Sequence, residues 1–295
     1  MRINSVCINC IFKNQYIQSF RASDEKTRLA FLREVAAQIY SIEETTTSVE
    51  LSAHCAQLQR AFLGCSQDYE SEKRKSNLLM LSHENAVRER IRNSKDPLLF
   101  SMMCALAGNY IDFAVVKNVN EEELFELIEK FTASNSENYS IYKRLLDDLH
   151  SAKTIAYLVD NCGEIVLDKL FIEEIHRRYS SSVYVVVRGD KVLNDATADD
   201  ATFVGLDSVA NIITTGNAFA GVVLGKVKPE TKSIIEKSDV IISKGQGNFE
   251  TLSGCKLNVY YLFLCKCDLF STRFNVEKHS AMILHEDEVA RYLPQ

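Results

Sequence analysis

The first half of the chain has apolar residues at helical spacing. Between positions 29 and 39 the apolar residues return every three or four positions, which predicts a helix with one face in a core. Ser23-Asp24-Glu25 supplies an N-cap for this helix, and Pro97 behind Asp96 marks the start of another. Helices are predicted over 29–39, 51–63, 98–116 and 124–131. We therefore expect residues 1–150 to form a helical bundle or cap.

Near residue 151 the pattern changes to short β-branched runs that alternate with helical stretches. This alternation is typical of a parallel sheet whose strands are joined by crossover helices. Strands are predicted at 154–159, 183–187, 212–214, 240–242 and 257–264, with helices at 164–179, 196–204 and 230–237. The predicted fold class is therefore α/β, with a doubly wound, mainly parallel sheet in residues 151–295 and an N-terminal helical domain or cap.

Composition and charge fit a globular protein that has no polyanionic partner. The 295 residues are 46% hydrophobic and 25% charged, and their formal net charge of -6 argues against binding to nucleic acid. No apolar run approaches the roughly 18 residues that a membrane helix needs. The N-terminus reaches the polar residues Lys13 and Asn14 too soon for a secretory signal. We expect a cytoplasmic protein with neither a nucleic-acid nor a membrane partner.

The cysteines do not have the pattern of a disulfide framework. There are nine, and most lie within apolar runs, as Cys104 and Cys265 do, which predicts reduced, buried thiols. Cys7 and Cys10 form a CxxC pair, but a structural zinc site needs four ligands and the sequence has no second CxxC. A redox dithiol would normally lie at a strand-to-helix junction. Neither zinc binding nor redox chemistry is therefore favoured for this pair.

Polar residues follow four of the predicted strands. In doubly wound sheets, ligands bind beyond the carboxyl ends of the strands. Asp160 and Asn161 follow the first strand, and Asp195 comes shortly after the second. Carboxylate and amide oxygens suit Mg²⁺ or Mn²⁺, and Mg²⁺ takes only one or two carboxylates from a protein. By itself the Asp160-Asn161 pair is more typical of a turn or helix cap, so it is the convergence of several strand ends that predicts a metal site.

The end of the fourth predicted strand has the features of an anion site. The glycines in Gly245-Gln246-Gly247 let backbone amides approach a ligand, and the helix start that follows favours an anion. Lys244 or Lys266 could neutralise phosphate oxygens. Taken alone, these glycines would be read as a tight turn, since no complete GxGxxG or Walker sequence is present. With the metal site, they predict phosphoryl transfer by positioning and charge stabilisation.

Several ordered motifs cover nearly the whole chain. They are Cys7-x-x-Cys10, Asp68-Tyr69 with Lys73 and Asn77, Gly108-Asn109-x-x-Asp112, Asp160-Asn161-x-Gly163-Glu164 with Asp168, Arg188-Gly189 with Asn194-Asp195, the run from Lys244 to Glu250, and Lys266-Cys267. In these motifs the chain resembles the damage-control phosphatases, and especially their short stand-alone branch with an N-terminal CxxC. The chain departs from the family pattern in lacking a proline before Tyr69, and in having Gly247 where alanine is common. We expect Gly247 in place of alanine to leave the turn intact.

The resemblance implies a divalent-metal-dependent phosphatase that hydrolyses small phosphorylated metabolites, including sugar phosphates and damaged cofactor precursors. Carried over residue by residue, it makes Asp160, Asn161 and Asp195 the metal ligands. The other residues that it assigns to the pocket are Glu250 and Lys266 at the phosphate end, Asn248 and Lys244 on the same rim, and Asn109 and Asp112 reaching in from the helical half. Residues 1–150 would cover the site and help to choose the substrate, and residues 151–295 would carry the metal.

The proposed chemistry leaves the metal and the nucleophile open. Mg²⁺ or Mn²⁺ is expected, with Co²⁺ and Ni²⁺ as further candidates. Lys266 would stabilise the developing charge, while either a metal-activated water or the Asp160 carboxylate could attack. An Asp-x-Asp nucleophile and acid pair would need a carboxylate where Cys162 stands. The alternatives are a protein carboxyl methyltransferase, an activity suggested for a eukaryotic branch of the family, and a non-catalytic metabolite-binding protein.

Overall fold

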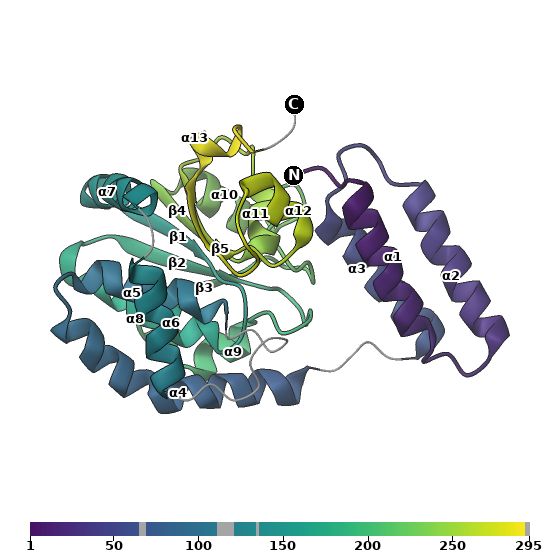
Figure 1. Cartoon of the computed structure of the whole chain (residues 1–295), viewed down its shortest axis with the longest axis horizontal. Coiled ribbons are helices and arrows are strands. Elements are labelled where there is room, and N and C mark those ends of the chain that lie inside the picture. The colour runs from purple at the N-terminus through teal and green to yellow at the C-terminus, as the bar shows by residue number, and fades with distance from the viewer. Residues whose placement is uncertain (65–68, 111–120, 134–135, 293–295) are drawn as a thin grey trace.

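A six-stranded sheet forms the centre of the structure (Figure 1). The computed structural model describes residues 1–64, 69–110, 121–133 and 136–292, so Asp68 and Asp112 lie outside the described residues. The strands are β1 (Thr154–Leu158), β2 (Ser182–Val187), β3 (Asn211–Thr214), β4 (Val240–Lys244), β5 (Val259–Leu264) and β6 (Ala281–His285). Their order is β3-β2-β1-β4-β5-β6, and β6 alone runs antiparallel to its neighbour. The predicted α/β class with a doubly wound, mainly parallel sheet is confirmed.

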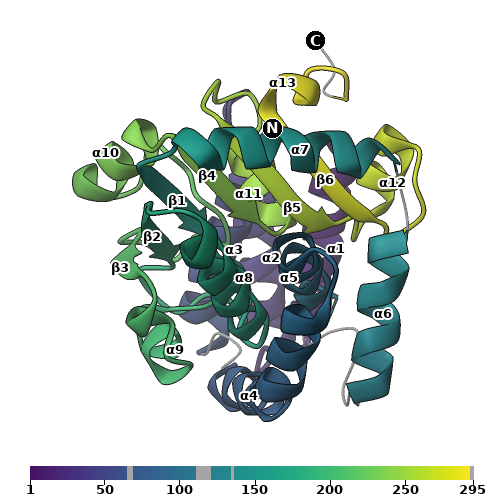
Figure 2. The same ribbon diagram turned by 90° about the vertical axis from the view of Figure 1, so that its left-hand side faces the viewer.

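Helices cover both faces of the sheet, because alternate strand residues point to opposite sides. Tyr157 and Ile242 belong to one large apolar core, and Ala156 and Ile241 to the other. Figure 2 shows α4, α5, α6 and α8 together on the first face. That face is covered by α4 (Glu70–Asn93), α5 (Pro97–Gly108), α6 (Glu121–Ala133), α7 (Ser136–Ser151), α8 (Glu164–Arg178) and α9 (Ala198–Phe203). The second face is covered by α10 (Pro229–Lys237), α11 (Gln246–Leu252), α12 (Asp268–Phe274) and α13 (Glu286–Val289).

The first three helices form a separate bundle, which stands to one side of the sheet in Figure 1. They are α1 (Ser5–Ser19), α2 (Glu25–Tyr40) and α3 (Ser48–Leu63), and their own small core contains Phe31, Val35, Leu51 and Cys55. The Asp24 side chain accepts a hydrogen bond from the Thr27 backbone at 2.7 Å, as an N-cap does. Helices α4 to α7 instead share the core of the sheet. The helical half of the chain is therefore divided between two cores.

Some elements differ from the prediction. Helix α5 ends at Gly108 rather than continuing to 116, because the amides of Asn109 and Tyr110 bond three residues back and tighten its last turn. Helix α11 begins at Gln246, directly after Gly245, whose φ of 81° lies in the left-handed region that favours glycine. The antiparallel strand β6 was not predicted.

The described residues bear on two further expectations. No helix among them is both long enough and apolar enough to cross a membrane. Their eight cysteines are all free thiols, in agreement with the absence of a disulfide framework. Half of these eight are buried, whereas Cys10 is exposed on α1.

Candidate functional site

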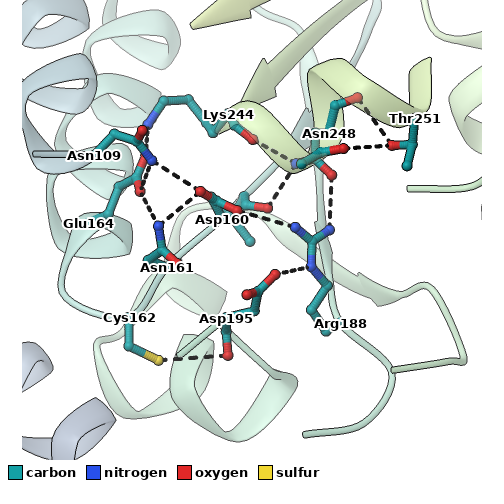
Figure 3. A network of polar contacts seen from close by, with 12 residues as sticks. Asn109, Asp160, Asn161, Cys162, Glu164, Arg188, Asp195, Lys244, Asn248 and Thr251 are labelled. Carbon is teal, nitrogen blue, oxygen red and sulfur yellow. Dashed lines mark hydrogen bonds and ion pairs between the residues drawn. The ribbon is translucent and has the colours of Figure 1, made fainter. Parts of the chain in front are cut away.

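The three predicted metal ligands lie together at the carboxyl end of β1. Asp160 and Asn161 follow this strand, and Asp195 comes from the loop after β2 (Figure 3). Asn161 and Asp195 form an isolated antiparallel bridge, and the Asp160 carbonyl accepts a hydrogen bond from the Ala196 amide at 2.8 Å. The backbone therefore holds the ends of β1 and β2 together, next to the point between β1 and β4 where the strand order reverses.

Arg188 connects the two carboxylates of this group. It follows β2 directly and is only 1% exposed. Its Nε donates to Asp195 at 2.6 Å, and a terminal nitrogen lies 3.4 Å from the Asp160 carboxylate. The other terminal nitrogen donates to the Asn248 side-chain oxygen at 3.0 Å. A planar guanidinium with several donors in a fixed arrangement can thus hold both carboxylates in place.

Lys244 does not lie on the rim of the site, where the sequence analysis placed it. Its ammonium group is fully buried and donates to Glu164, to Asp168 at 2.7 Å and to the Ala105 carbonyl at 2.8 Å. The Tyr157 hydroxyl donates to the same Asp168 oxygen at 2.6 Å. The expected role of Lys244 in neutralising phosphate is therefore corrected, because its charge is already bound by two carboxylates beneath the site.

Two amide side chains connect Asp160 with Glu164. Asn109 donates to Asp160 at 3.0 Å and to Glu164 at 2.9 Å, so this predicted residue does reach the site from the end of α5. Asn161 donates to the same two carboxylates, at 2.8 and 3.3 Å. Because the amide nitrogen of Asn161 faces these acceptors, its amide oxygen points away from them and is available as a ligand.

Asn248 has a supporting position rather than the predicted place on the rim. It is fully buried, and its amide nitrogen donates to the Val159 and Lys244 carbonyls at 3.2 and 2.7 Å. Since its oxygen accepts from Arg188, all of its described contacts are within the protein. Asn248 thus connects the ends of β1 and β4 beneath the site.

Two glycines after β4, Gly245 before α11 and Gly247 in its first turn, allow close contacts with other parts of the chain. A Cβ atom at Gly245 would lie 2.1 Å from a carboxylate oxygen of Asp160. A Cβ atom at Gly247 would lie 2.2 Å from the backbone oxygen of Ala220. Alanine, which is common at this position in the family, would therefore require a backbone segment of this chain to move.

Glu250 and Lys266 are connected through Gln246. The Gln246 amide nitrogen donates to Glu250 at 2.8 Å, and its oxygen accepts from the Lys266 backbone at 3.0 Å. Glu250 also accepts a hydrogen bond from the Ser48 hydroxyl at the start of α3, and burial raises the pKa of its carboxyl group. These contacts place Glu250 where the N-terminal bundle meets the sheet.

The site has more negative charge than its cations offset. Burial, together with the nearby Asp195 and Glu164 carboxylates, raises the pKa of Asp160 to about 8 against the opposing charges of Lys266 and Arg188. A bound cation would favour the ionised form of Asp160. Among the described residues no group of three or more His, Cys, Asp or Glu side chains could hold a metal. A set of two carboxylates and one amide oxygen instead fits a hard cation such as Mg²⁺ that retains several waters.

Glu164, Arg188 and helix α4 also support the site, although no role was predicted for them. The Asn77 side chain of α4 accepts from the Gly163 amide at 2.6 Å, and Lys73 lies 2.7 Å from the Asp200 carboxylate. The first contact holds the turn after β1, and the second joins α4 to α9. Glu164 and Arg188 could have been found from the sequence, because each adjoins an apolar run. A charged side chain that is buried in such a place must find a partner.

Comparison with known proteins identifies relatives along most of the chain. The damage-control phosphatase ARMT1-like domain matches residues 3–282. A damage-control phosphatase of Archaeoglobus fulgidus is 28% identical over 274 residues, which cover 91% of this chain and 93% of that protein. A damage-control phosphatase of Pyrococcus horikoshii is 31% identical over 222 residues, 74% of each chain. An uncharacterized protein of Methanocaldococcus jannaschii is 34% identical over 228 residues, 73% of this chain and 72% of that one.

The solved structures give the same result. The crystal structure of a DUF89 family protein from Pyrococcus horikoshii has a TM-score of 0.82 at 27% identity, and the match covers 97% of this chain and 99% of that one. The relatives' names support phosphatase activity of the metabolite-repair type and do not favour a methyltransferase. Membership of the branch with an N-terminal CxxC stays a prediction. The chain belongs to the family of the damage-control phosphatase ARMT1-like domain.

Proposed function

We propose that this protein hydrolyses small phosphorylated metabolites, such as sugar phosphates or damaged cofactor precursors, with a divalent cation held by Asp160, Asn161 and Asp195. The observation that carries the proposal is the cluster of buried oxygen ligands at the β1 end, where burial and neighbouring carboxylates raise the pKa of Asp160 to about 8. Mg²⁺ or Mn²⁺ is the first choice for these ligands, and Co²⁺ or Ni²⁺ would also bind them.

The residues around the cluster have separate roles in this proposal. A bound cation would supply charge stabilisation to the phosphate oxygens. Arg188 keeps the Asp160 and Asp195 carboxylates at fixed positions through its contacts of 3.4 and 2.6 Å. Lys266, whose charge acts on Asp160, stabilises the negative charge that develops on the phosphoryl group. Glu250 lies at the phosphate end, next to the Gln246 side chain that also contacts the Lys266 backbone.

Two nucleophiles are compatible with this arrangement: a water molecule, or the carboxylate of Asp160. Cys162 is unsuited to the task, because it is buried and burial raises the pKa of its thiol. Acid quenching during turnover, followed by borohydride reduction, digestion and mass spectrometry, distinguishes the two nucleophiles, because only attack by Asp160 forms an acyl phosphate, which borohydride reduces to homoserine at position 160.

The test of the proposed function is a phosphatase screen over sugar phosphates and cofactor phosphates. Each substrate is assayed with EDTA, and then with Mg²⁺, Mn²⁺, Co²⁺ or Ni²⁺ in excess of the chelator. We expect activity to disappear in EDTA and to return with a divalent ion. Full activity in EDTA would overturn the metal requirement, and no turnover of any phosphate ester with any ion would overturn the phosphatase itself.

A further inference from the structure

A cleft of about 530 Å³ lies between the N-terminal bundle and the loops that follow β2 and β3. Helices α1 and α3 form one wall, the first residues of α4 lie at its border, and the segments 190–193 and 217–219 form the other wall. This volume is within the range of small-molecule sites, which occur preferentially where two parts of a protein meet. The cleft is therefore large enough to bind a metabolite.

The wall formed by 190–193 also supports the proposed metal site. The Asp195 amide donates to the Val192 carbonyl at 3.1 Å, and the Cys162 amide donates to the Asn194 carbonyl at 2.9 Å. The other loop is connected to it, since the Gly189 amide donates to the Asn217 carbonyl at 2.9 Å. The loops that line the cleft thus belong to the same hydrogen-bonded unit as Asp195, at the carboxyl ends of the strands, where ligands bind in such sheets.

Polar side chains dominate the bundle side of the cleft. Asn14, Gln18 and Gln57 offer carboxamides, which can both donate and accept hydrogen bonds. Across the cleft, Lys191 is already paired with Glu70 at 3.3 Å. Arg60, in the last turn of α3, has no ion pair or hydrogen bond with any other residue that the structure describes. Its guanidinium is therefore available to an anionic ligand, and its geometry suits a carboxylate or a phosphate.

We propose that this cleft binds the part of the substrate that lies beyond the hydrolysed phosphate, and that Arg60 selects substrates with a second anionic group. The inference rests on the proposed phosphatase function and adds the substrate class: phosphate esters of polar molecules that also have a carboxylate or another phosphate. The carboxamides bind the hydroxyl groups of the leaving group, while Arg60 binds its charge. Arg60 is a specificity residue and takes no part in phosphate cleavage.

Competition against hydrolysis of a generic aryl phosphate tests this preference, whether or not the competitor is itself hydrolysed. Two pairs of competitors separate the sources of charge: 6-phosphogluconate against glucose 6-phosphate for a carboxylate, and fructose 1,6-bisphosphate against fructose 6-phosphate for a second phosphate. We expect the doubly anionic member of at least one pair to bind more tightly to the wild type. Arg60→Gln should weaken its binding roughly tenfold, change that of its singly anionic partner less than twofold, and preserve kcat for the aryl phosphate.

Arg33→Gln is the matched control, because Arg33 is exposed on α2 away from the lining of the cleft. Equal inhibition constants within both pairs for the wild type would overturn the proposal. So would an equal change in affinity for all four competitors in Arg60→Gln. A wild type that hydrolyses no phosphate ester would instead refute the proposed function. In that case, calorimetric titration with the same four compounds still decides whether Arg60 recognises an anion.

A second variant tests whether the cleft is occupied at all. Ala53 lines the cleft from α3, so Ala53→Phe should fill part of it. We expect the KM for sugar phosphates to rise several-fold, while hydrolysis of methyl phosphate, whose leaving group is too short to reach the cleft from the proposed metal site, stays unchanged. Similar losses for both kinds of substrate would place the leaving group elsewhere.

Discussion

Two carboxylate clusters lie next to each other at the end of β1, and they differ in how their charge is offset. The inner cluster contains Glu164 and Asp168, which bind the fully buried ammonium group of Lys244. The rim cluster contains Asp160 and Asp195, which share Arg188. Arg188 lies 3.4 Å from Asp160, a longer contact than the 2.7 Å between Lys244 and Asp168.

The pKa values of the two clusters agree with these distances. Burial raises the pKa of Asp168 and the charge of Lys244 opposes it, so that this pKa rises only to about 6, whereas the pKa of Asp160 rises to about 8. The inner cluster is thus largely neutralised by the chain itself, and the rim cluster would gain more from an added cation. Buried charges of the same kind, a few residues apart, therefore differ in their surroundings: the inner ones bind Lys244, and the rim ones are the proposed ligands of a cation.

Removal of a rim carboxylate should have the largest effect. Asp160→Ala and Asp195→Ala should each lower metal-stimulated hydrolysis of an aryl phosphate by roughly a thousandfold, because each removes a proposed cation ligand. Steady-state kinetics measures the loss. Asp199→Ala, at an exposed position on α9, is the control and should behave as the wild type. Near-normal turnover in either rim variant would refute the ligand assignment.

Removal of the inner cation should act on stability. Lys244→Met leaves Glu164 and Asp168 buried without their partner, which should lower the free energy of unfolding by about 3–5 kcal/mol. Urea denaturation followed by circular dichroism measures the change. Lys232→Met, in a half-exposed ion pair on α10, should change it by less than ~1 kcal/mol. A loss in Lys244→Met as small as that of this control would remove the distinction between the clusters.

Glu164 connects the two clusters, so its neutral variant should have an intermediate effect. Glu164→Gln keeps the size of the side chain but replaces an acceptor that faces both Lys244 and the Asn161 amide. The Asn161 amide then loses its orientation, and Mn²⁺ affinity should fall by roughly 10–100-fold. Calorimetric titration of the substrate-free protein measures this affinity, and Glu174→Gln on the same helix is the control. Unchanged Mn²⁺ binding would show that Glu164 acts only within the inner cluster.

The smallest expected effect is a dependence of stability on pH. The pKa of Asp160 rises from 3.8 to about 8 on folding, so the metal-free folded protein holds a proton that the unfolded chain releases between these values. The stabilising contribution of the protonated group is complete below the lower pKa and is lost as the pH rises through the higher one. In EDTA, the melting temperature of wild type should therefore fall relative to Asp160→Asn by ~3 °C or more between pH 5 and 8. Parallel melting curves would contradict the raised pKa.

Much of the fold could be predicted from local patterns. β-branched runs located the five parallel strands, because buried strands are rich in such residues. The cap at Asp24 was also predictable, since its hydrogen bond reaches only to Thr27. Strand β6 was harder to recognise, because it lies at the edge and pairs only with β5. The contact that Asn109 makes just after α5 could not be predicted locally, because its partner Asp160 is distant in the sequence.

The site was predicted less completely than the fold. The proximity of Asp160, Asn161 and Asp195, the proposed metal ligands, followed from the rule that strand ends converge. The directions in which the long side chains point could not be predicted from that rule. Lys244 could have been placed correctly, because side chains alternate along a strand and position 244 shares a face with Ile242, which belongs to the core beneath α8. The contacts of Arg188 with Asp195 and Asn248 depend on loops whose path the sequence does not encode locally.

The contact between Gly245 and Asp160 has a consequence for how this protein can evolve. The Asp160 carboxylate occupies the space that any side chain at 245 would need. A mutation that adds even a methyl group there displaces a proposed metal ligand, although residue 245 has no side chain with which to take part in the reaction. Across relatives that keep the activity, we expect positions 160 and 245 to be conserved as a pair, and a lineage that loses the glycine to lose the carboxylate soon afterwards.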